Sequence, residues 1–206
     1  VGISSPLNTG NDVQSGQVEV YGWTGDAWTR KGRVFNGSQF DQRLAYVDLS
    51  SDGNIASIGS SKYDAFESLG YKPDAGRVQV FQWNNTKWKQ LGDSLTGEAG
   101  EFFGQHSLSA DGKILAVSAP YAGLNGSNEG RVSVYGLAGE FWKKLSFDIS
   151  GEAANNYLYY LSLSRDGSAL VTGARYNNGL NGAQSGHARV YKTAVDADFD
   201  GYADSN

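Results

Sequence analysis

The chain alternates apolar and polar residues in short runs, and one such run occurs four times. The copies begin at residues 16, 76, 130 and 186 and read GQVEVY, GRVQVF, GRVSVY and GHARVY, so their spacings are 60, 54 and 56 residues. Valine or alanine occupies every second position, as expected for a strand with one buried face. A fixed period of this length predicts a repeat architecture built from equivalent strands.

A second strand follows each of the first three copies after a short turn. These strands begin at Trp28, Trp88 and Trp142. Asn84-Asn85 and Gly139-Glu140 lie between the paired runs, and both pairs contain residues that tolerate a positive φ. The spacing therefore predicts a β-hairpin in each copy.

A third and a fourth strand flank an Asp-Gly pair in each period. The pairs begin at Asp52, Asp111 and Asp166, each with a Ser two residues earlier and an apolar run shortly afterwards. Asp-Gly between two alternating runs is typical of a type I′ hairpin. We therefore assign these aspartates to turns and not to a ligand site.

Each period of about 56 residues thus supplies four antiparallel strands, which bury their faces by packing on neighbouring copies. Four-stranded sheets repeated radially are β-propeller blades, and a linear stack of small sheets is the alternative. The pattern predicts an all-β, β-propeller-like fold over residues 1–193, with three full repeats and a partial repeat at each end. Fourteen strands grouped three, four, four and three would close as a small propeller or would form part of a larger one.

The repeat resembles a known family. The pattern Ser-Leu-Ser-x-Asp-Gly, then an apolar run, a Gly-rich loop and Gly-x-Val-x-Val-Tyr, is similar to the FG-GAP-related, integrin alpha N-terminal-like propeller repeats of secreted bacterial and algal surface proteins. Phe103-Gly104 stands where that family has its Phe-Gly. The resemblance implies a secreted or cell-surface protein with a role in adhesion. Because integrin-type blades carry an Asp-x-Asp-x-Asp-Gly loop that is missing here, it implies no calcium in the blades.

The last residues carry a separate acidic motif. Oxygen-bearing residues recur at alternate positions around a glycine, at Asp196, Asp198, Asp200, Tyr202 and Asp204. Side-chain oxygens at these positions, with the Tyr202 carbonyl, suit a Ca²⁺ loop of the EF-hand type. The motif also resembles thrombospondin type 3 calcium repeats. We therefore treat 194–206 as a calcium-binding tail or the start of another module; the alternative is a flexible acidic tail.

Composition excludes several classes of partner. The formal net charge is −5 and basic residues do not cluster, which argues against nucleic acid as a partner. No apolar run is long enough to span a bilayer, so no membrane insertion is expected. The 206 residues include no Cys and no Met, so thiol chemistry is absent and we expect a processed or excerpted chain.

Three sequons predict glycosylation of a secreted protein, at Asn36, Asn84 and Asn125. The two histidines, His106 and His187, occupy strand positions of the repeat, and we interpret both as structural.

The aromatic residues divide into two groups. The tryptophans recur at matched repeat positions, so we expect them to pack between sheets instead of forming a carbohydrate platform. Tyr157, Tyr159 and Tyr160 lie outside this register and are surface candidates. The loops 63–75, 121–129 and 176–185 join equivalent strands, so we expect them to collect on one rim.

These observations predict an extracellular structural or adhesive protein, a module of a cell-surface or filamentous assembly that joins itself or neighbouring domains through strand edges. The alternative is a ligand-binding propeller that recognises glycans or protein through the rim loops. No nucleophile elbow, metal motif or phosphate-binding loop is present, and we therefore expect no enzyme activity.

Overall fold

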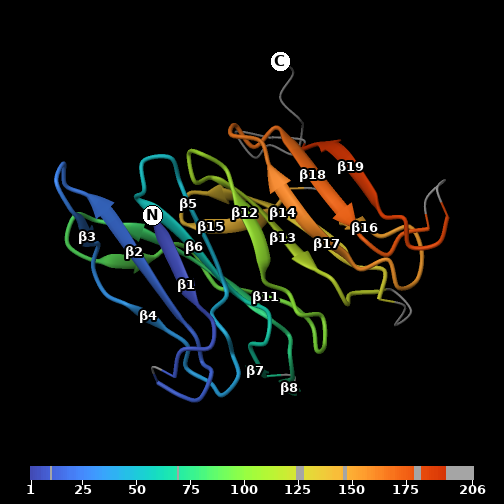
Figure 1. Cartoon of the computed structure of the whole chain (residues 1–206), viewed down its shortest axis with the longest axis horizontal. Helices are drawn as coiled ribbons and strands as arrows, with labels where there is room; N and C mark the ends of the chain where they lie inside the picture. The colour runs from blue at the N-terminus through green and yellow to red at the C-terminus, as the bar shows by residue number, and fades with distance from the viewer. Residues whose placement is uncertain (10, 69, 124–127, 146–147, 179–181, 194–206) are drawn as a thin grey trace. The chain divides into compact units, whose positions relative to one another are not determined.

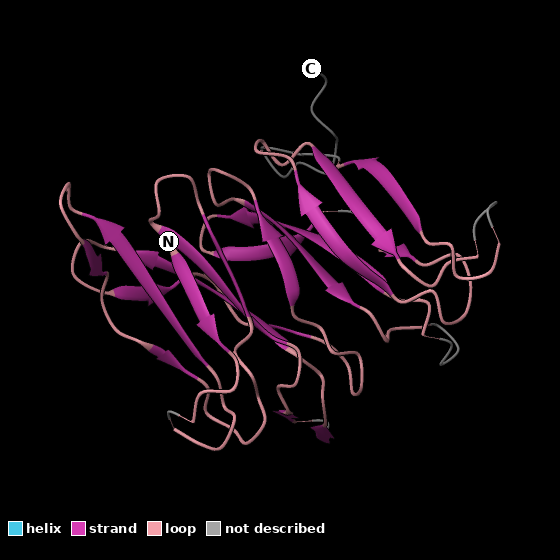
Figure 2. Ribbon diagram, viewed as in Figure 1, coloured by secondary structure: helices cyan, strands magenta, loops and turns pink. Residues whose placement is uncertain are grey.

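The computed structural model describes residues 1–9, 11–68, 70–123, 128–145, 148–178 and 182–193 (Figure 1). All regular structure in these residues is β-strand, without a helix (Figure 2). It follows that the described residues contain no long apolar helix of the kind that crosses a membrane. The chain forms two compact units, unit 1 from Val1 to Gly104 and unit 2 from Gln105 to Asn206.

Unit 1 contains two antiparallel sheets and a small hairpin. The first sheet has the order β1-β2-β3, and β4 also pairs with β2. Its strands are β1 (Gly2–Ser5), β2 (Gln17–Trp23), β3 (Trp28–Arg30) and β4 (Phe35–Asn36). The second sheet has the order β10-β9-β6-β5, and β11 also pairs with β9. Its strands are β5 (Tyr46–Leu49), β6 (Ile55–Ser60), β9 (Arg77–Trp83), β10 (Trp88–Gln90) and β11 (Leu95–Thr96). The hairpin consists of β7 (Ala65–Glu67) and β8 (Gly70–Lys72).

Unit 2 also contains two antiparallel sheets. One sheet has the order β12-β13-β14-β15, and β16 also pairs with β14. Its strands are β12 (Gln105–Leu108), β13 (Ile114–Ala119), β14 (Arg131–Ala138), β15 (Phe141–Lys144) and β16 (Ile149–Ser150). The last sheet has the order β17-β18-β19, with strands β17 (Leu158–Leu163), β18 (Ala169–Ala174) and β19 (His187–Lys192).

The main strands are grouped three, four, four and three, as the repeat predicts. Each inner sheet joins the last two strands of one sequence period to the first two of the next. The short strands β4, β11 and β16 and the β7–β8 hairpin are not predicted, because two or three residues cannot show an alternating pattern.

The alternating apolar positions form the cores. In unit 1, Val18 and Val20 are buried with Phe35, Phe81 and Trp88. In unit 2, valines of β14 are buried with residues of β13, β17 and β18; the cluster comprises Ile114, Ala116, Val132, Val134, Leu158, Leu170 and Ala174. His106, on β12, is also buried, consistent with a structural role.

The Asp-Gly turns are not type I′, which corrects the sequence prediction. Type I′ needs a positive φ at both central residues, but Gly53, Gly112 and Gly167 have positive φ and the aspartates before them do not. In each turn a Ser hydroxyl donates to the Asp carboxylate at 2.6 Å and accepts from a backbone N–H at 2.9 Å. These side-chain hydrogen bonds favour a turn in which, of the Asp-Gly pair, only the glycine has a left-handed backbone.

Candidate functional site

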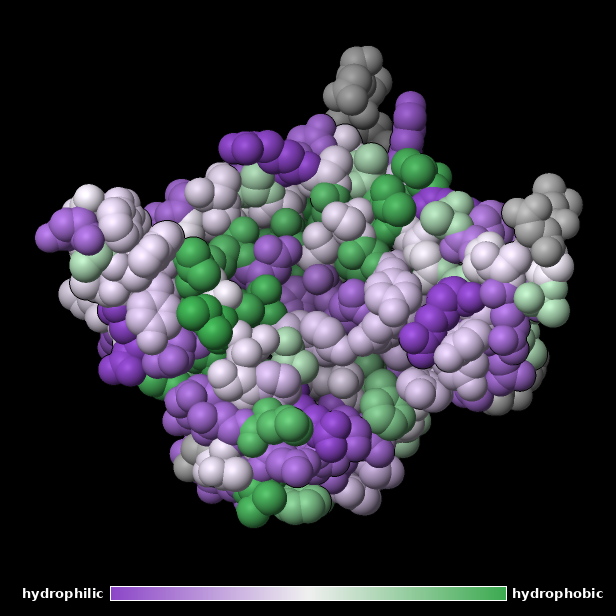
Figure 3. Space-filling model, viewed as in Figure 1, coloured by the Kyte–Doolittle hydropathy of each residue, from purple (hydrophilic) through white to green (hydrophobic). Residues whose placement is uncertain are grey.

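The hairpin of the first sheet ends in a pair of exposed tryptophans. Trp23 closes β2, Trp28 opens β3, and the two residues are direct cross-strand partners. Their ring centroids lie 5.4 Å apart with the planes at 57°. Both side chains remain more than half exposed, at 55% and 54%. Apolar residues reach the surface at several places in the molecule (Figure 3). Trp23 and Trp28 are among the large hydrophobic residues with high exposure.

The equivalent pair of the second sheet, Trp83 and Trp88, has almost the same geometry but is covered. Its centroids lie 5.3 Å apart at 56°, yet Trp88 is 4% exposed. Lys31, which follows β3, places its Nζ 5.5 Å from both ring centroids. The Trp88 Nε1–H donates to the Lys31 carbonyl at 2.6 Å. Within unit 1 no described segment covers Trp23 and Trp28 in this way, so the prediction that the tryptophans pack between sheets holds for one pair and fails for the other.

A cavity of about 260 Å³ lies beside the exposed pair. Its walls are the ends of β2 and β3, Lys31 and the turn Ser50–Gly53. The Lys31 ammonium donates to the Gly53 carbonyl and to Asn54 Oδ1, both at 2.7 Å. We call this the Trp23–Trp28 pocket. Its polar wall is held by these hydrogen bonds.

The two charges of the pocket are tuned by their surroundings. The Ser50 hydroxyl and the Asn54 backbone N–H both bind Asp52 and lower the pKa of its carboxyl below 3.8, so Asp52 is ionised at neutral pH. Burial lowers the pKa of Lys31, and the negative charge of Asp52 opposes that effect. An anion and a cation, both held by hydrogen bonds, therefore line the pocket together with the two indole rings, and a ligand with several hydroxyl groups could bind both charges.

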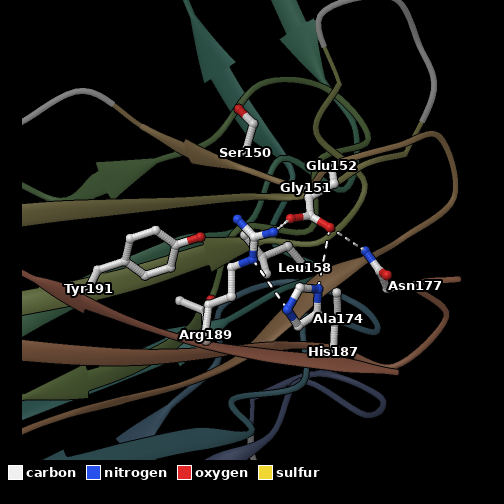
Figure 4. A pocket seen from close by; sticks show the side chains of 10 residues that line it. Ser150, Gly151, Glu152, Leu158, Ala174, Asn177, His187, Arg189 and Tyr191 are labelled. Atoms are coloured by element: carbon white, nitrogen blue, oxygen red, sulfur yellow. Dashed lines mark hydrogen bonds and ion pairs between the residues drawn. The ribbon is translucent and has the colours of Figure 1, made fainter. Parts of the chain in front are cut away.

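Unit 2 contains a polar cluster of another kind (Figure 4). Glu152, just after β16, receives a hydrogen bond from Asn177 Nδ2 at 3.0 Å and lies 3.3 Å from His187 Nδ1. Arg189 forms an ion pair with the other carboxylate oxygen. Arg189 Nε also donates to His187 Nε2 at 3.3 Å. Sequence reasoning missed this cluster because its members are distant along the chain.

The Glu152 cluster is suited to fixing a strand. The cavity that it lines holds about 20 Å³, which is room for roughly one water molecule. Both ring nitrogens of His187 already have partners. The cluster thus ties β19 to the loop after β16, and the structural interpretation of His187 agrees with this geometry.

The tyrosines of unit 2 form a short row. Tyr157 lies edge-on between Tyr121 and Tyr176, with centroid distances of 5.2 Å and 5.6 Å. Tyr159 and Tyr160 make a separate contact at 5.0 Å, and Tyr160 is 47% exposed. Tyr121 and Tyr176 each open one of the predicted rim loops, so these two loops begin close together.

Of the other predicted sites, two sequon asparagines lie in the described residues, and the third sequon and the calcium motif do not. Asn36 ends β4 and is exposed, and its Oδ1 accepts from Gln17. Asn84 Oδ1 accepts from the backbone N–H groups of Thr86 and Lys87, which shapes the β9–β10 turn. Asn125 and the calcium motif at 196–204 lie outside the described residues. Among the residues that are described, no group of three or more His, Asp or Glu side chains is placed to hold a metal.

Comparisons with known proteins identify the fold and no family. No family model matches the chain, and no curated protein matches it. Among solved structures, the chain is similar to a putative 6-phosphogluconolactonase from Bacteroides uniformis, with 15% identity and a TM-score of 0.56. The match covers 87% of this chain and 45% of that one. A prolyl endopeptidase matches with 14% identity and a TM-score of 0.48, over 87% of this chain and 25% of the other.

The class of protein follows from these findings. The chain is an all-β, β-propeller-like repeat protein that spans less than half the length of the lactonase structure it resembles.

The expectation that the protein is not an enzyme is wrong. It rested on the lack of a familiar catalytic motif, yet this fold is shared with a putative lactonase. The architecture therefore does not exclude catalysis, although at 15% identity the likeness concerns the fold alone.

Proposed function

We propose that unit 1 binds a saccharide in the Trp23–Trp28 pocket. The observation that carries the proposal is the exposure of both indoles beside a cavity of about 260 Å³. Exposed aromatic pairs leave apolar area in water, which a ligand can cover. The apolar C–H face of a sugar ring suits an indole face, and its hydroxyls can meet the polar wall around Lys31.

Preorganisation supports this interpretation. The exposed pair has the same ring spacing and tilt as the covered Trp83–Trp88 pair. The arrangement is therefore set by the hairpin itself and does not need a covering segment. A ligand that binds there should lose little free energy to ordering the side chains, because the hairpin already holds the two rings at one spacing and tilt.

Binding of uncharged oligosaccharides to the whole protein, measured by calorimetry after a glycan-array screen, tests the proposal. Trp23→Ala and Trp28→Ala should each weaken binding by about tenfold or more. Phe66→Ala is the matched control, since Phe66 is an aromatic residue of the same unit that is 74% exposed on β7, away from the pocket. If Phe66→Ala weakened saccharide binding as much as the tryptophan variants do, the proposal would be contradicted. The absence of any saccharide ligand would contradict it as well.

Self-association through β19 is a second candidate function. β19 pairs with β18 on one side, and in the described part of the chain no strand pairs with its other edge. Val190 on this strand is 72% exposed. Strands with an open edge template pairing with another chain, which favours the structural or adhesive role. An extracellular location, glycosylation of the sequons and calcium binding by the tail stay predictions of the sequence.

A further inference from the structure

A second cavity of unit 1 gathers two arginines without an acidic partner. It holds about 320 Å³ and is lined by strands β4, β9 and β10, with Arg33 and Arg77 among its walls and no Asp or Glu. Four other cations of the unit contact a carboxylate: Arg30, Arg43, Lys62 and Lys72. In the described part of the chain no carboxylate forms an ion pair with Arg33 or Arg77. For a chain of net charge −5, this is a local concentration of uncompensated positive charge.

Aromatic rings hold both guanidinium groups in place. Arg77 Cζ lies 3.7 Å from the centroid of Tyr63. Arg33 Cζ lies 5.3 Å from the ring of Phe35 and 5.8 Å from that of Phe81. Stacking on a ring orients a guanidinium without neutralising it, so its N–H edge stays able to bind an oxyanion.

The rest of the cavity suits a polar, elongated ligand. Arg77 and Phe81 are four residues apart on β9, so their Cα atoms are separated by about 13 Å. Arg33 stacks at the Phe81 end, and Gln79 and Gln90 line the wall between the two positions. The Gln79 amide nitrogen donates to Gln90 Oε1 and Ser94 Oγ, both at 3.1 Å, and its carbonyl oxygen can accept from a ligand hydroxyl. The two guanidinium groups bind acid groups at different points along the ligand.

We propose that the Arg33–Arg77 cavity binds an acidic oligosaccharide, one that carries carboxylate or sulfate groups on more than one sugar. Both groups offer the paired oxygens that a guanidinium binds with two parallel N–H groups. The site is carried by residues other than those of the Trp23–Trp28 pocket, so each proposal can fail without the other.

Three probes of equal length test this proposal on the whole protein by calorimetry: a four-sugar oligogalacturonate, a sulfated four-sugar oligosaccharide and uncharged cellotetraose. At least one acidic probe should bind, and binding should weaken as salt is added. Comparison of the first two probes tells whether carboxylate or sulfate is preferred. Binding of neither acidic probe would overturn the proposal, as would binding of cellotetraose that Arg33→Gln and Arg77→Gln weaken as much as they weaken binding of the acidic probes.

Arginine variants locate the site. Arg33→Gln and Arg77→Gln should each weaken binding of the acidic probe by about tenfold or more, because each removes a charge-assisted contact. Arg30→Gln is the control: it makes the same charge change in the same unit, at a residue paired with Glu19 at 3.2 Å. Arg33 is exposed, so its variant should fold even if Arg77→Gln does not. Trp23→Ala should leave acidic-probe binding unchanged. An equal loss in Arg30→Gln would reveal unspecific attraction and would refute the site.

Discussion

In each of the three repeated Asp-Gly turns, one Ser side chain and one Asp side chain make the same hydrogen bond, from Ser Oγ to Asp Oδ1. A Ser hydroxyl donates to an Asp carboxylate oxygen that also accepts from the backbone N–H two residues later. In the last repeat this network lowers the pKa of Asp166 from 3.8 to about 2, with the Ser164 hydroxyl as the largest cause. The carboxylate is therefore a part of the turn that only its ionised form can complete.

This shift predicts how stability depends on pH. Because the folded pKa of Asp166 is depressed, its contribution is fully present above the unfolded pKa of 3.8 and is lost as the pH falls towards about 2. The difference in urea midpoint between the wild type and Asp166→Asn should thus be constant near neutral pH and shrink across that window. A difference that is the same at both ends of the window would contradict the role of the charge.

At the scale of elements, the glycine before each repeated strand allows the backbone there to lie close to the backbone of a residue about 28 residues later, as Gly130 does to Leu158. Gly130 precedes β14 with φ +82°, and a Cβ built there would lie 2.3 Å from the backbone nitrogen of Leu158. Gly16 and Gly76 are equally crowded at the equivalent positions. The repeated glycine is therefore required by both backbone conformation and space.

A matched pair of variants separates these two requirements. Gly139, in the turn between β14 and β15, has φ +63° and no atom within 4 Å of the point that a Cβ would occupy. Gly139→Ala should cost about 1–2 kcal/mol from the left-handed backbone. Gly130→Ala should cost about 1–3 kcal/mol more, because the methyl group also overpacks against Leu158. Chemical denaturation measures both free energies of unfolding, and equal costs would show that the close approach is unimportant.

At the scale of the whole molecule, the open edge of β19 predicts association. Sedimentation velocity over a range of concentrations should show assembly of the wild type. Val190→Lys, on the edge strand, should shift it towards monomer, because charge on an edge opposes strand pairing. Val171→Lys on the central strand β18 is the control, since Val171 is the direct cross-strand partner of Val190 and is 44% exposed. An effect of equal size in both variants would point to face-to-face contact and against edge pairing.

The sequence alone determined the pattern of the main strands, the positions of the turns between them and the grouping of these main strands into sheets. These features follow from period-two alternation and from residues such as Gly53 and Asn85, whose local conformation is set within a few bonds. The turn type predicted from Asp-Gly alone was wrong, because the Asp side chain accepts a hydrogen bond from the hydroxyl of the Ser two residues before it and this bond favours another turn.

Tertiary structure decided which of these equivalent residues became available for binding. Trp23–Trp28 and Trp83–Trp88 are alike in sequence, and Lys31 covers the second pair alone. Arg33 and Arg77 share a cavity although they are distant along the chain. Whether a side chain is exposed, and which distant residues lie near it, depends on what packs against its sheet. A repeated sequence has the same residue pattern at covered and at open positions, so the sequence alone cannot distinguish the two.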